Sequence, residues 1–300
     1  MRAKFNWTIK YALIIFCIGC YFFSCYTNAQ ITHPKASPFA IVEQEVGLSR
    51  ITVAYSRPAT RGRHIFGPQE DGQQGLVPYG RIWRVGANES TKITVDTNME
   101  VMGNPLPIGT YALYAFPEKD AWEIVFHTNT THWGDGRKNY DPAEDLFRVT
   151  VIPSVVPYHQ ENFEIAFDSI THNSARLNLI WASTKLTLPI TVDTAAQMEV
   201  EIAQQLNEDP TAQTYYEAAR YLQEQQKDPE RALGYVNKAL ALGGDTYYFH
   251  RVKSLIQADL GNYQAAIISA RKSLEIAAAL EKDEFVRMNQ KNIKAWEEKQ

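Results

Sequence analysis

The chain has little cysteine, and the little that it has is confined to its start. Cys17, Cys20 and Cys25 are its three cysteines among 300 residues. The chain after Cys25 therefore cannot form an intramolecular disulfide or a thiolate metal site. Its stability has to come from side-chain packing.

Sequence motifs of common catalytic sites are also missing. The chain has no G-x-S-x-G elbow, no phosphate-binding loop and no H-E-x-x-H helix. His127 and His132 are five residues apart, a spacing that fits neither one strand face nor one helix face. The segment from His132 to Arg137 places Asp and Gly alternately but lacks the carboxylates of a calcium loop. We predict no catalytic residue, no metal site and no cofactor.

An excess of positive charge is absent as well, except at the N-terminus. Arg2, Lys4 and Lys10 precede an apolar run from Tyr11 to Phe23, and small residues follow at 27–29. This pattern predicts a secretory signal peptide over residues 1–29, because the apolar run is short for a membrane span. Export would place the chain in the periplasm or outside the cell.

Loss of residues 1–29 would move the formal net charge from −4 to −7, since three basic residues and no acid are removed. A chain of that charge has no general attraction to nucleic acid or to an anionic membrane. We expect neither as a partner and no transmembrane segment in the mature chain. Cys25 offers an alternative, a lipidated anchor, although Phe22 is a poor residue three positions before such a cysteine.

From Ile41 to Thr191 the apolar residues recur with a period of two. One run, Ile93 to Val101, reads as a single strand with one buried face and one wet face. Similar runs are Ile51 to Tyr55, Tyr111 to Phe116, Trp122 to His127, Phe147 to Val151, Phe163 to Phe167, Arg176 to Trp181 and Leu186 to Ile190. Turn signals separate them, so we predict an antiparallel β-sandwich over residues 30–193, with a closed barrel as the alternative.

The large rings of these strands are predicted to form the core. They are Tyr111, Tyr114, Phe116, Trp122, Phe126, Phe163, Phe167 and Trp181.

Residues 194–300 change to a helical period. Ala195 to Leu206 predicts one helix, and the break at Pro210 precedes another. Five residues then recur 34 positions later, from Ala232, Leu233, Lys238, Ala239 and Leu240 to Ala266, Ile267, Lys272, Ser273 and Leu274. Period, turns and small residues together resemble the tetratricopeptide repeat. The resemblance implies a helical stack that holds a protein or peptide, and the alternative is a helical extension that only stabilises the chain. An amphipathic helix from about residue 283 is expected to cap the last repeat.

The stretch from Arg57 to Thr91 departs from both periods. Its arginines stand among glycines, prolines and aromatic residues, which is typical of a fixed loop rather than a strand. Several guanidinium groups held together could bind a carboxylate or phosphate. Alternatively they could stack on Tyr79 and Trp83, or pair with Glu89, Asp135 or Asp145, and pin the loop. The candidate ligand-binding residues are Arg57, Arg61, Arg63, Arg81, Trp83, Arg84, Asn88 and Glu89.

Several separated motifs resemble a bacterial secreted domain of unknown function, numbered 2911. They are RPxxRGRxIFG, LVPYGRIWRVGANESTKI, LPIGTYALYAFP, WEIVFHTN and DLFRVTV, and the resemblance runs from about Pro34 to Asp193. The coinciding residues include Arg57, Gly62, Arg63, Phe66, Gly67, Pro78, Gly80, Trp83, Arg84, Gly86, Ala87 and Asn88. The resemblance implies export, a β-rich domain and a helical extension, and no catalytic residue.

The function predicted from the sequence is an exported binding or scaffold protein. The helices would engage a protein or peptide, and the β domain would hold an anionic or carbohydrate ligand near the arginine-rich loop. The alternative is a cell-envelope glycan hydrolase with acids drawn from the loops, for which Glu89, Asp135, Asp145 and Glu161 are the candidates.

Overall fold

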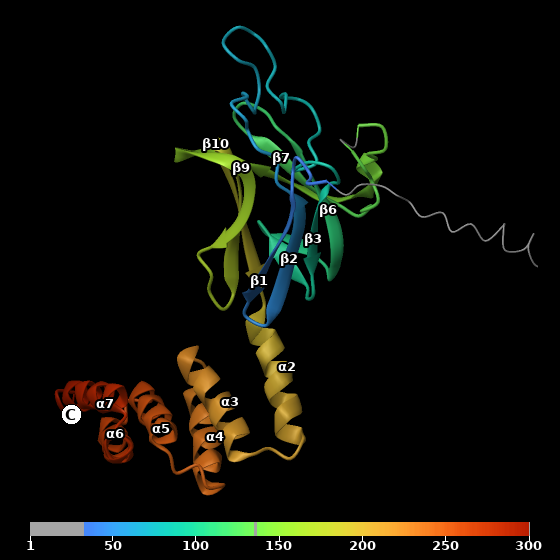
Figure 1. Ribbon diagram of the computed structural model, residues 1–300. Helices are drawn as coiled ribbons and strands as arrows, with labels where there is room; N and C mark the ends of the chain where they lie inside the picture. Colours follow the sequence, from blue (N-terminus) through green and yellow to red (C-terminus); the bar gives the residue numbers. More distant parts are fainter. Residues whose placement is uncertain (1–32, 135–136, 300) are drawn as a thin grey trace, which may run out of the picture.

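The computed structural model describes residues 33–134 and 137–299 of the chain. Two antiparallel sheets form its N-terminal part, and helices follow (Figure 1). The β-sandwich predicted from the period of two is confirmed, and the described strands do not close into a barrel. The predicted signal segment 1–29 and the alternative anchor Cys25 lie outside the described residues.

The larger sheet has six strands and the smaller sheet has four. The larger runs in the order β1 (Phe39–Val46), β2 (Ser49–Ser56), β3 (Thr91–Val95), β6 (Gly109–Phe116), β7 (Trp122–His127) and β8 (Asp145–Val151). The smaller runs in the order β5 (Asn104–Leu106), β4 (Met99–Val101), β10 (Ser174–Val192) and β9 (Ser154–Asp168). Every strand pair is antiparallel, and the chain changes sheet at three places, after β3, after β5 and after β8.

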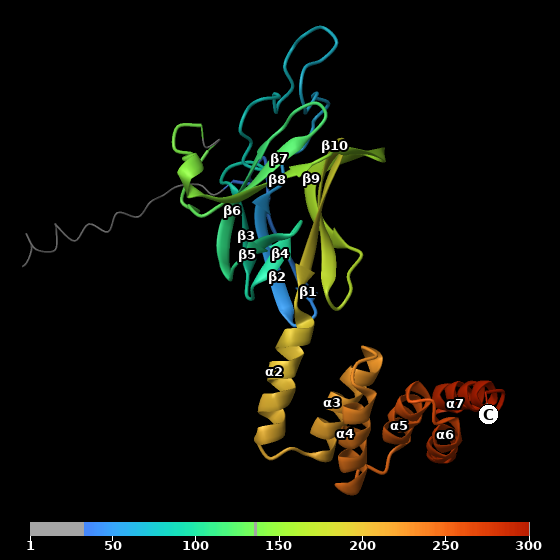
Figure 2. The same cartoon turned by 180° about the vertical axis from the view of Figure 1, so that it is seen from behind.

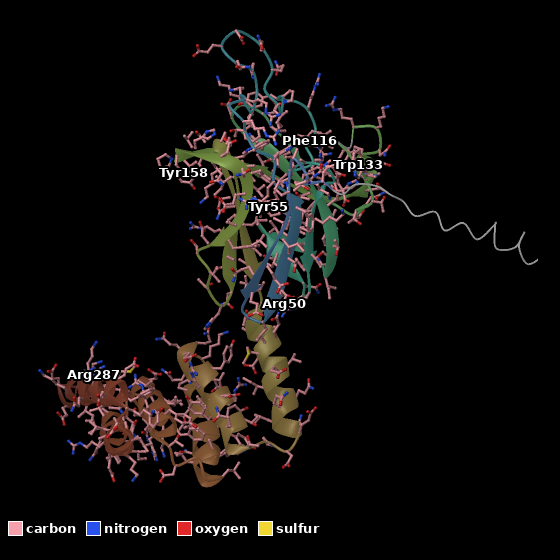
Figure 3. All side chains as sticks on the ribbon, viewed as in Figure 1. Arg50, Tyr55, Phe116, Trp133, Tyr158 and Arg287 are labelled. Carbon is pink, nitrogen blue, oxygen red and sulfur yellow. The ribbon has the colours of Figure 1, made fainter. Side chains whose placement is uncertain are left out.

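Large rings fill the space between the sheets. Trp83, Trp122, Phe163 and Trp181 are all buried and contact one another edge to face or stacked. Tyr55 of β2 reaches across to β9, where its hydroxyl accepts a hydrogen bond from the backbone N–H of Ile165 at 3.1 Å (Figure 3). The hydrogen bond satisfies a polar atom inside an otherwise apolar layer.

The predicted strand from Ile93 to Val101 is wrong, because the chain changes sheet within it. β3 ends at Val95 and belongs to the larger sheet, whereas β4 begins at Met99 and pairs with β10. Asp96 holds the corner by accepting a hydrogen bond from the backbone N–H of Arg50 at 2.7 Å. Both strands face the same core, so the alternation of buried side chains continues across the corner and hides it.

The runs Arg176 to Trp181 and Leu186 to Ile190 were predicted as two strands and form one. β10 continues through both, and its pairing with β9 shifts register on either side of Ala182. These irregularities have the character of β-bulges, which bend a strand without ending it. Polar residues near 183–185 therefore mark a bend rather than a turn.

Two of the aromatic residues expected in the core lie on the other face of the larger sheet. Tyr114 and Phe116 of β6 point away from the smaller sheet and pack with Ile82 and Tyr140. We call this side of the larger sheet the outer face. Tyr114 is fully buried there, because Ile82 and Tyr140, from the loops after β2 and β7, pack over the strands.

The helices are α2 (Thr194–Asn207), α3 (Ala212–Glu224), α4 (Pro229–Ala241), α5 (Tyr247–Asp259), α6 (Tyr263–Ala279) and α7 (Asp283–Glu297). α2 continues from β10, and the other helices stack side by side beyond it (Figure 2). Among the helices that the structure describes, none has the length and apolar character needed to cross a membrane.

The repeat of 34 residues is visible in the packing. Ala232 and Ala239 of α4 are fully buried, and so are Ala266 and Ser273, which occupy the matching positions of α6. Trp296 of α7 packs against α6, so the last helix covers the end of the stack as expected. Assignment of these helices to the tetratricopeptide class stays a prediction.

Candidate functional site

The arginine-rich loop is fixed by its own guanidinium groups. No named strand lies between Ser56 and Thr91, in agreement with the prediction of a loop. Arg57 Nε donates to the carbonyl of Phe163 in β9 at 3.0 Å. Arg63 donates to the carbonyls of Thr60 and Ala59 at 2.9 and 2.7 Å. These side chains therefore donate to backbone oxygens. Such hydrogen bonds fix the loop but do not neutralise the charge of the arginines.

Arg61 lies at the same end of the loop and is anchored differently. Its backbone N–H donates to Glu161 Oε1 at 2.8 Å, and its Nη2 donates to the carbonyl of Ala36 at 3.1 Å. The hydroxyl of Thr60 donates to the other oxygen of Glu161. The hydrogen bonds that Glu161 accepts, first the one from the Thr60 hydroxyl and then the one from the Arg61 backbone N–H, lower the pKa of its carboxyl. Glu161 therefore links β9 to the loop through hydrogen bonds.

The carboxylates proposed from the sequence as partners of these arginines are engaged elsewhere. Glu89 pairs with Lys92 at 2.7 Å, which lowers the pKa of Glu89. Asp145 pairs with Arg148 at 2.8 Å. Asp135 lies outside the described residues. Three of the carboxylates named for the alternative hydrolase, Glu89, Asp145 and Glu161, are thus held in separate networks, with Glu161 bound to Thr60.

Trp83 and Asn88 have structural contacts. Trp83 is 7% exposed, and its indole N–H donates to the carbonyl of Gly86 at 3.1 Å. Asn88 has a positive φ of 62°, and its amide donates to Ser37 O and Ser56 Oγ at 3.2 and 3.0 Å. A left-handed Asn with a bonded side chain is typical of a tight turn. These two residues shape the loop that presents the arginines.

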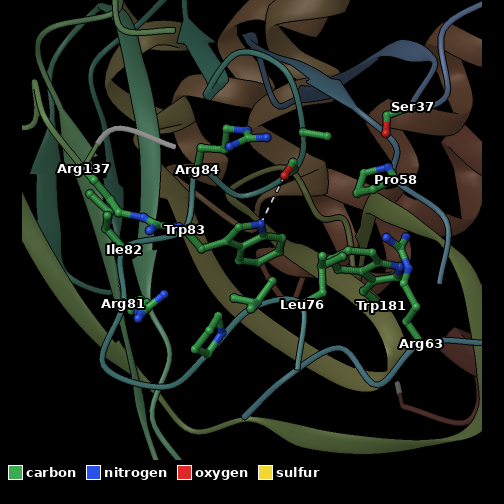
Figure 4. A pocket seen from close by; sticks show the side chains of 14 residues that line it. Ser37, Pro58, Arg63, Leu76, Arg81, Ile82, Trp83, Arg84, Arg137 and Trp181 are labelled. Atoms are coloured by element: carbon green, nitrogen blue, oxygen red, sulfur yellow. Dashed lines mark hydrogen bonds between the residues drawn. The ribbon is translucent and has the colours of Figure 1, made fainter. Parts of the chain in front are cut away.

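Four arginines line one hollow of about 260 Å³ beside this loop (Figure 4). They are Arg63, Arg81, Arg84 and Arg137. The remaining lining residues are Ser37, Pro58, Leu76, Val77, Pro78, Ile82, Trp83, Gly86, Ala87 and Trp181, and none of these described residues is acidic. We call this space the arginine hollow. Its described lining contains four arginines and no acidic residue.

Arg81 differs from its neighbours in the arginine hollow. It is exposed and makes no ion pair or hydrogen bond with the residues that the structure describes, whereas Arg84 and Arg137 each have an interaction of their own. Arg81 and Arg137 also border a second hollow, shared with Phe116, Tyr140 and Arg148. The two hollows thus share a basic rim.

A polar network lies behind that second hollow, on the outer face. The phenol of Tyr140 donates to Asp145 at 2.8 Å, and Arg148 Nη2 donates to the phenol at 2.9 Å. Burial, with the adjacent Asp145 carboxylate adding to it, raises the pKa of Tyr140 well above its ordinary value. Asp145 also accepts from Nδ1 of His127 at 3.0 Å. The sequence prediction did not include this network, although Asp145 and Arg148 lie in the DLFRVTV motif and Tyr140 lies five residues before it.

Fold and site together define a class of protein: a two-sheet antiparallel sandwich with a basic hollow under a long loop, extended by a helical stack. The sandwich matches the family model described as "Protein of unknown function (DUF2911)" over residues 37–190, and the chain belongs to this family. The match agrees with the motifs seen in the sequence. No curated protein and no solved structure gives a significant match to the chain.

Proposed function

We propose that the chain is an exported binding protein whose β domain holds a small anionic ligand in the arginine hollow. The observation that carries the proposal is the lining itself, four arginines and no described acid around one space. Guanidinium groups match carboxylate and phosphate oxygens in geometry as well as in charge. Like charges held close together repel one another, and an anion relieves that repulsion.

An anion fits the hollow better than a neutral sugar. Trp83 and Trp181 line the hollow, but both are buried and their rings stack on each other, while Trp83 also contacts Phe163 and Trp181 also contacts Phe66. Sugar binding by stacking needs an exposed ring face. The guanidinium group available to a ligand is that of Arg81, because its side chain is exposed and has no partner among the described residues.

Titration calorimetry at low ionic strength tests this proposal with inorganic phosphate and citrate as probes. We expect Arg81→Gln to weaken binding by at least about tenfold, since each charge-assisted hydrogen bond contributes about 1.5–3 kcal/mol. Arg176→Gln is the matched control, because Arg176 is an exposed arginine on β10, away from the hollow. Binding that is lost equally in both variants, or that is absent from the wild type, would contradict the proposal.

The helices support a second part of the proposal, engagement of a protein or peptide. Rings form a continuous row across three helices: Tyr216 of α3 contacts Tyr248 of α5, and Tyr247 contacts Phe285 of α7, with centroids 5.0 and 4.6 Å apart. Arg251 lies between the same helices and donates to Asn289 Oδ1 at 3.3 Å. Burial lowers the pKa of Arg251, and no described carboxylate forms an ion pair with it.

Capture of envelope proteins on the immobilised full chain tests the helical surface. Arg251→Met keeps the length of the side chain and removes its charge, so a partner with an acidic contact should be captured less. Arg287→Met on the exposed side of α7 is the control. A captured set that is identical for the wild type and both variants would count against a role for this surface.

A further inference from the structure

We propose that His127, His132 and Glu144 form a binding site for a divalent transition metal of the zinc type on the outer face of the larger sheet. Each of the three offers one ligand atom, and these atoms lie within 4.8 Å of one another. Two imidazoles and one carboxylate are a common ligand set for zinc with an open fourth position. The site is independent of the anion proposed for the arginine hollow.

His127 carries the strongest part of this inference. Its side chain is 0% exposed, and its Nδ1 lies 3.0 Å from Asp145 Oδ1. Asp145 already accepts from Tyr140 and Arg148, so its carboxylate acts as an acceptor and Nδ1 of His127 as the donor. The lone pair of a neutral His127 is then on Nε2. A carboxylate on the far nitrogen is the arrangement that orients metal-binding histidines.

Nε2 of His127 is buried and has no hydrogen-bond partner among the described residues. The atom that faces it is Oε2 of Glu144, 3.4 Å away, which is also an acceptor. Two acceptors that face each other at this distance, one of them buried, repel unless a cation lies between them. A tetrahedral zinc with ligands at about 2.0–2.1 Å separates its ligand atoms by about 3.4 Å. The spacing of these two atoms therefore already suits a metal.

His132 completes the set from the loop that follows β7. Its ring centroid is 5.6 Å from that of His127, and its Nδ1 lies 3.4 Å from the hydroxyl of Tyr114. The sequence analysis judged the spacing of His127 and His132 as if both lay on one strand or one helix. In the structure His132 lies in the loop after β7, and this loop brings its ring back beside His127. Because His132 is only half buried, its ring can move toward the other two ligands and leave room for a water or substrate.

Glu144 is oriented by its neighbours as a ligand would need to be. The amide of Asn129 donates to both of its carboxylate oxygens at 3.2 Å. Its backbone carbonyl accepts from the N–H and the hydroxyl of Thr128 at 2.9 and 2.8 Å. The two ends of the loop are thereby tied together, so Glu144 is held opposite the end of β7. Hydrogen bonds of this kind around the ligands raise metal affinity.

Metal binding by tag-free full-length mature protein tests the site. After dialysis against a chelator, the protein is titrated with Zn²⁺ by calorimetry and with Co²⁺ by visible absorption. We expect one equivalent of Zn²⁺, a Co²⁺ spectrum of four- or five-coordinate intensity, and a higher melting temperature with Zn²⁺. His132→Ala and Glu144→Gln should each weaken binding by at least about 100-fold, and Asp145→Asn by about 10–100-fold.

The control is His250→Gln. His250 pairs with Asp245 at 2.7 Å in the helical region, where the described residues form no three-ligand group. His132 and Glu144 are partly exposed, so their variants are expected to fold even if a change at buried His127 prevents folding. Zinc binding by His132→Ala and Glu144→Gln at the wild-type level would overturn the proposal. Failure of the wild type to bind Zn²⁺ and Co²⁺ would overturn it too, and would leave His127 as a donor to Glu144.

Discussion

At the end of β7 both faces of the larger sheet are buried, but by different means. Phe126 and His127 are consecutive residues of β7 on opposite faces, and each is 0% exposed. Phe126 faces the second sheet, whose aromatic and aliphatic side chains meet it. His127 faces loops that bring Asp145 and Glu144. Apolar burial stabilises the fold directly, whereas polar burial requires a partner for each atom and leaves reactive atoms in fixed positions.

Removal of a large ring from the inner face should give the largest loss of stability. Trp181→Ala removes a ring of β10 that is 2% exposed and contacts Trp83, Phe66 and Phe163 in the core between the sheets. We expect the free energy of unfolding to fall by about 3–5 kcal/mol in urea denaturation. Tyr158→Ala on exposed β9 is the control and should change it by less than about 0.5 kcal/mol. A loss from Trp181→Ala no larger than that of the control would remove the distinction between the faces.

On the outer face, the loss should come from hydrogen bonds rather than from volume. Tyr140→Phe keeps the ring against His127 and Phe116 but removes the hydroxyl that bonds Asp145 and Arg148. We expect a loss of about 1.5–3 kcal/mol in the free energy of unfolding, because the partners are charged. Urea denaturation measures it, with Tyr158→Phe as the exposed control. An unchanged stability would mean that packing alone holds the outer face.

The arginines of the loop offer a sharper contrast. Arg57→Gln removes a hydrogen bond to the Phe163 carbonyl and should lower the free energy of unfolding by about 1 kcal/mol. Arg81→Gln removes no bond to a described residue and should change it by less than about 0.5 kcal/mol. The same denaturation assay measures both. A larger loss of stability in Arg81→Gln than in Arg57→Gln would contradict the view that Arg57 stabilises the loop and Arg81 does not.

The smallest expected effect is a dependence of stability on alkaline pH. The pKa of Tyr140 is raised in the folded chain, so the neutral phenol is favoured there. Its contribution is complete below the ordinary tyrosine pKa of 10.0 and is lost as the pH rises above that value toward the folded-state pKa. Unfolding free energies at pH 9 and pH 11 measure it. The decline should be shallower in Tyr140→Phe, and equal slopes would place the pH dependence elsewhere.

The sandwich could be predicted because burial on one face imposes a period of two on each strand. The same rule hid the corner at Asp96, since Val95 and Met99 face one core from different sheets. The period of two also predicted that the outer face of β7 is exposed to solvent. The cover over His127 comes from a loop without a period, and no local pattern in such a loop reveals what it lies against.

The arginine-rich stretch was recognised from composition, and its loop character is confirmed. Which arginine binds the chain and which faces open space could not be predicted, because Arg57 and Arg63 bond to backbone carbonyls. Every residue has a backbone carbonyl, so the sequence does not show which carbonyls accept hydrogen bonds from these arginines. Charge pairing, which the sequence does show, suggested Glu89 and Asp145, and both are engaged with other cations.

β10 has a mechanical consequence for the whole molecule. It spans Ser174–Val192, pairs with β9 on one side and β4 on the other, and is followed at once by Asp193, whose side chain caps α2. A force that pulls the helical stack away from the sandwich acts along β10 and loads its hydrogen bonds together in shear. The helices should then extend before the sandwich yields, so that the basic hollow keeps its shape under tension.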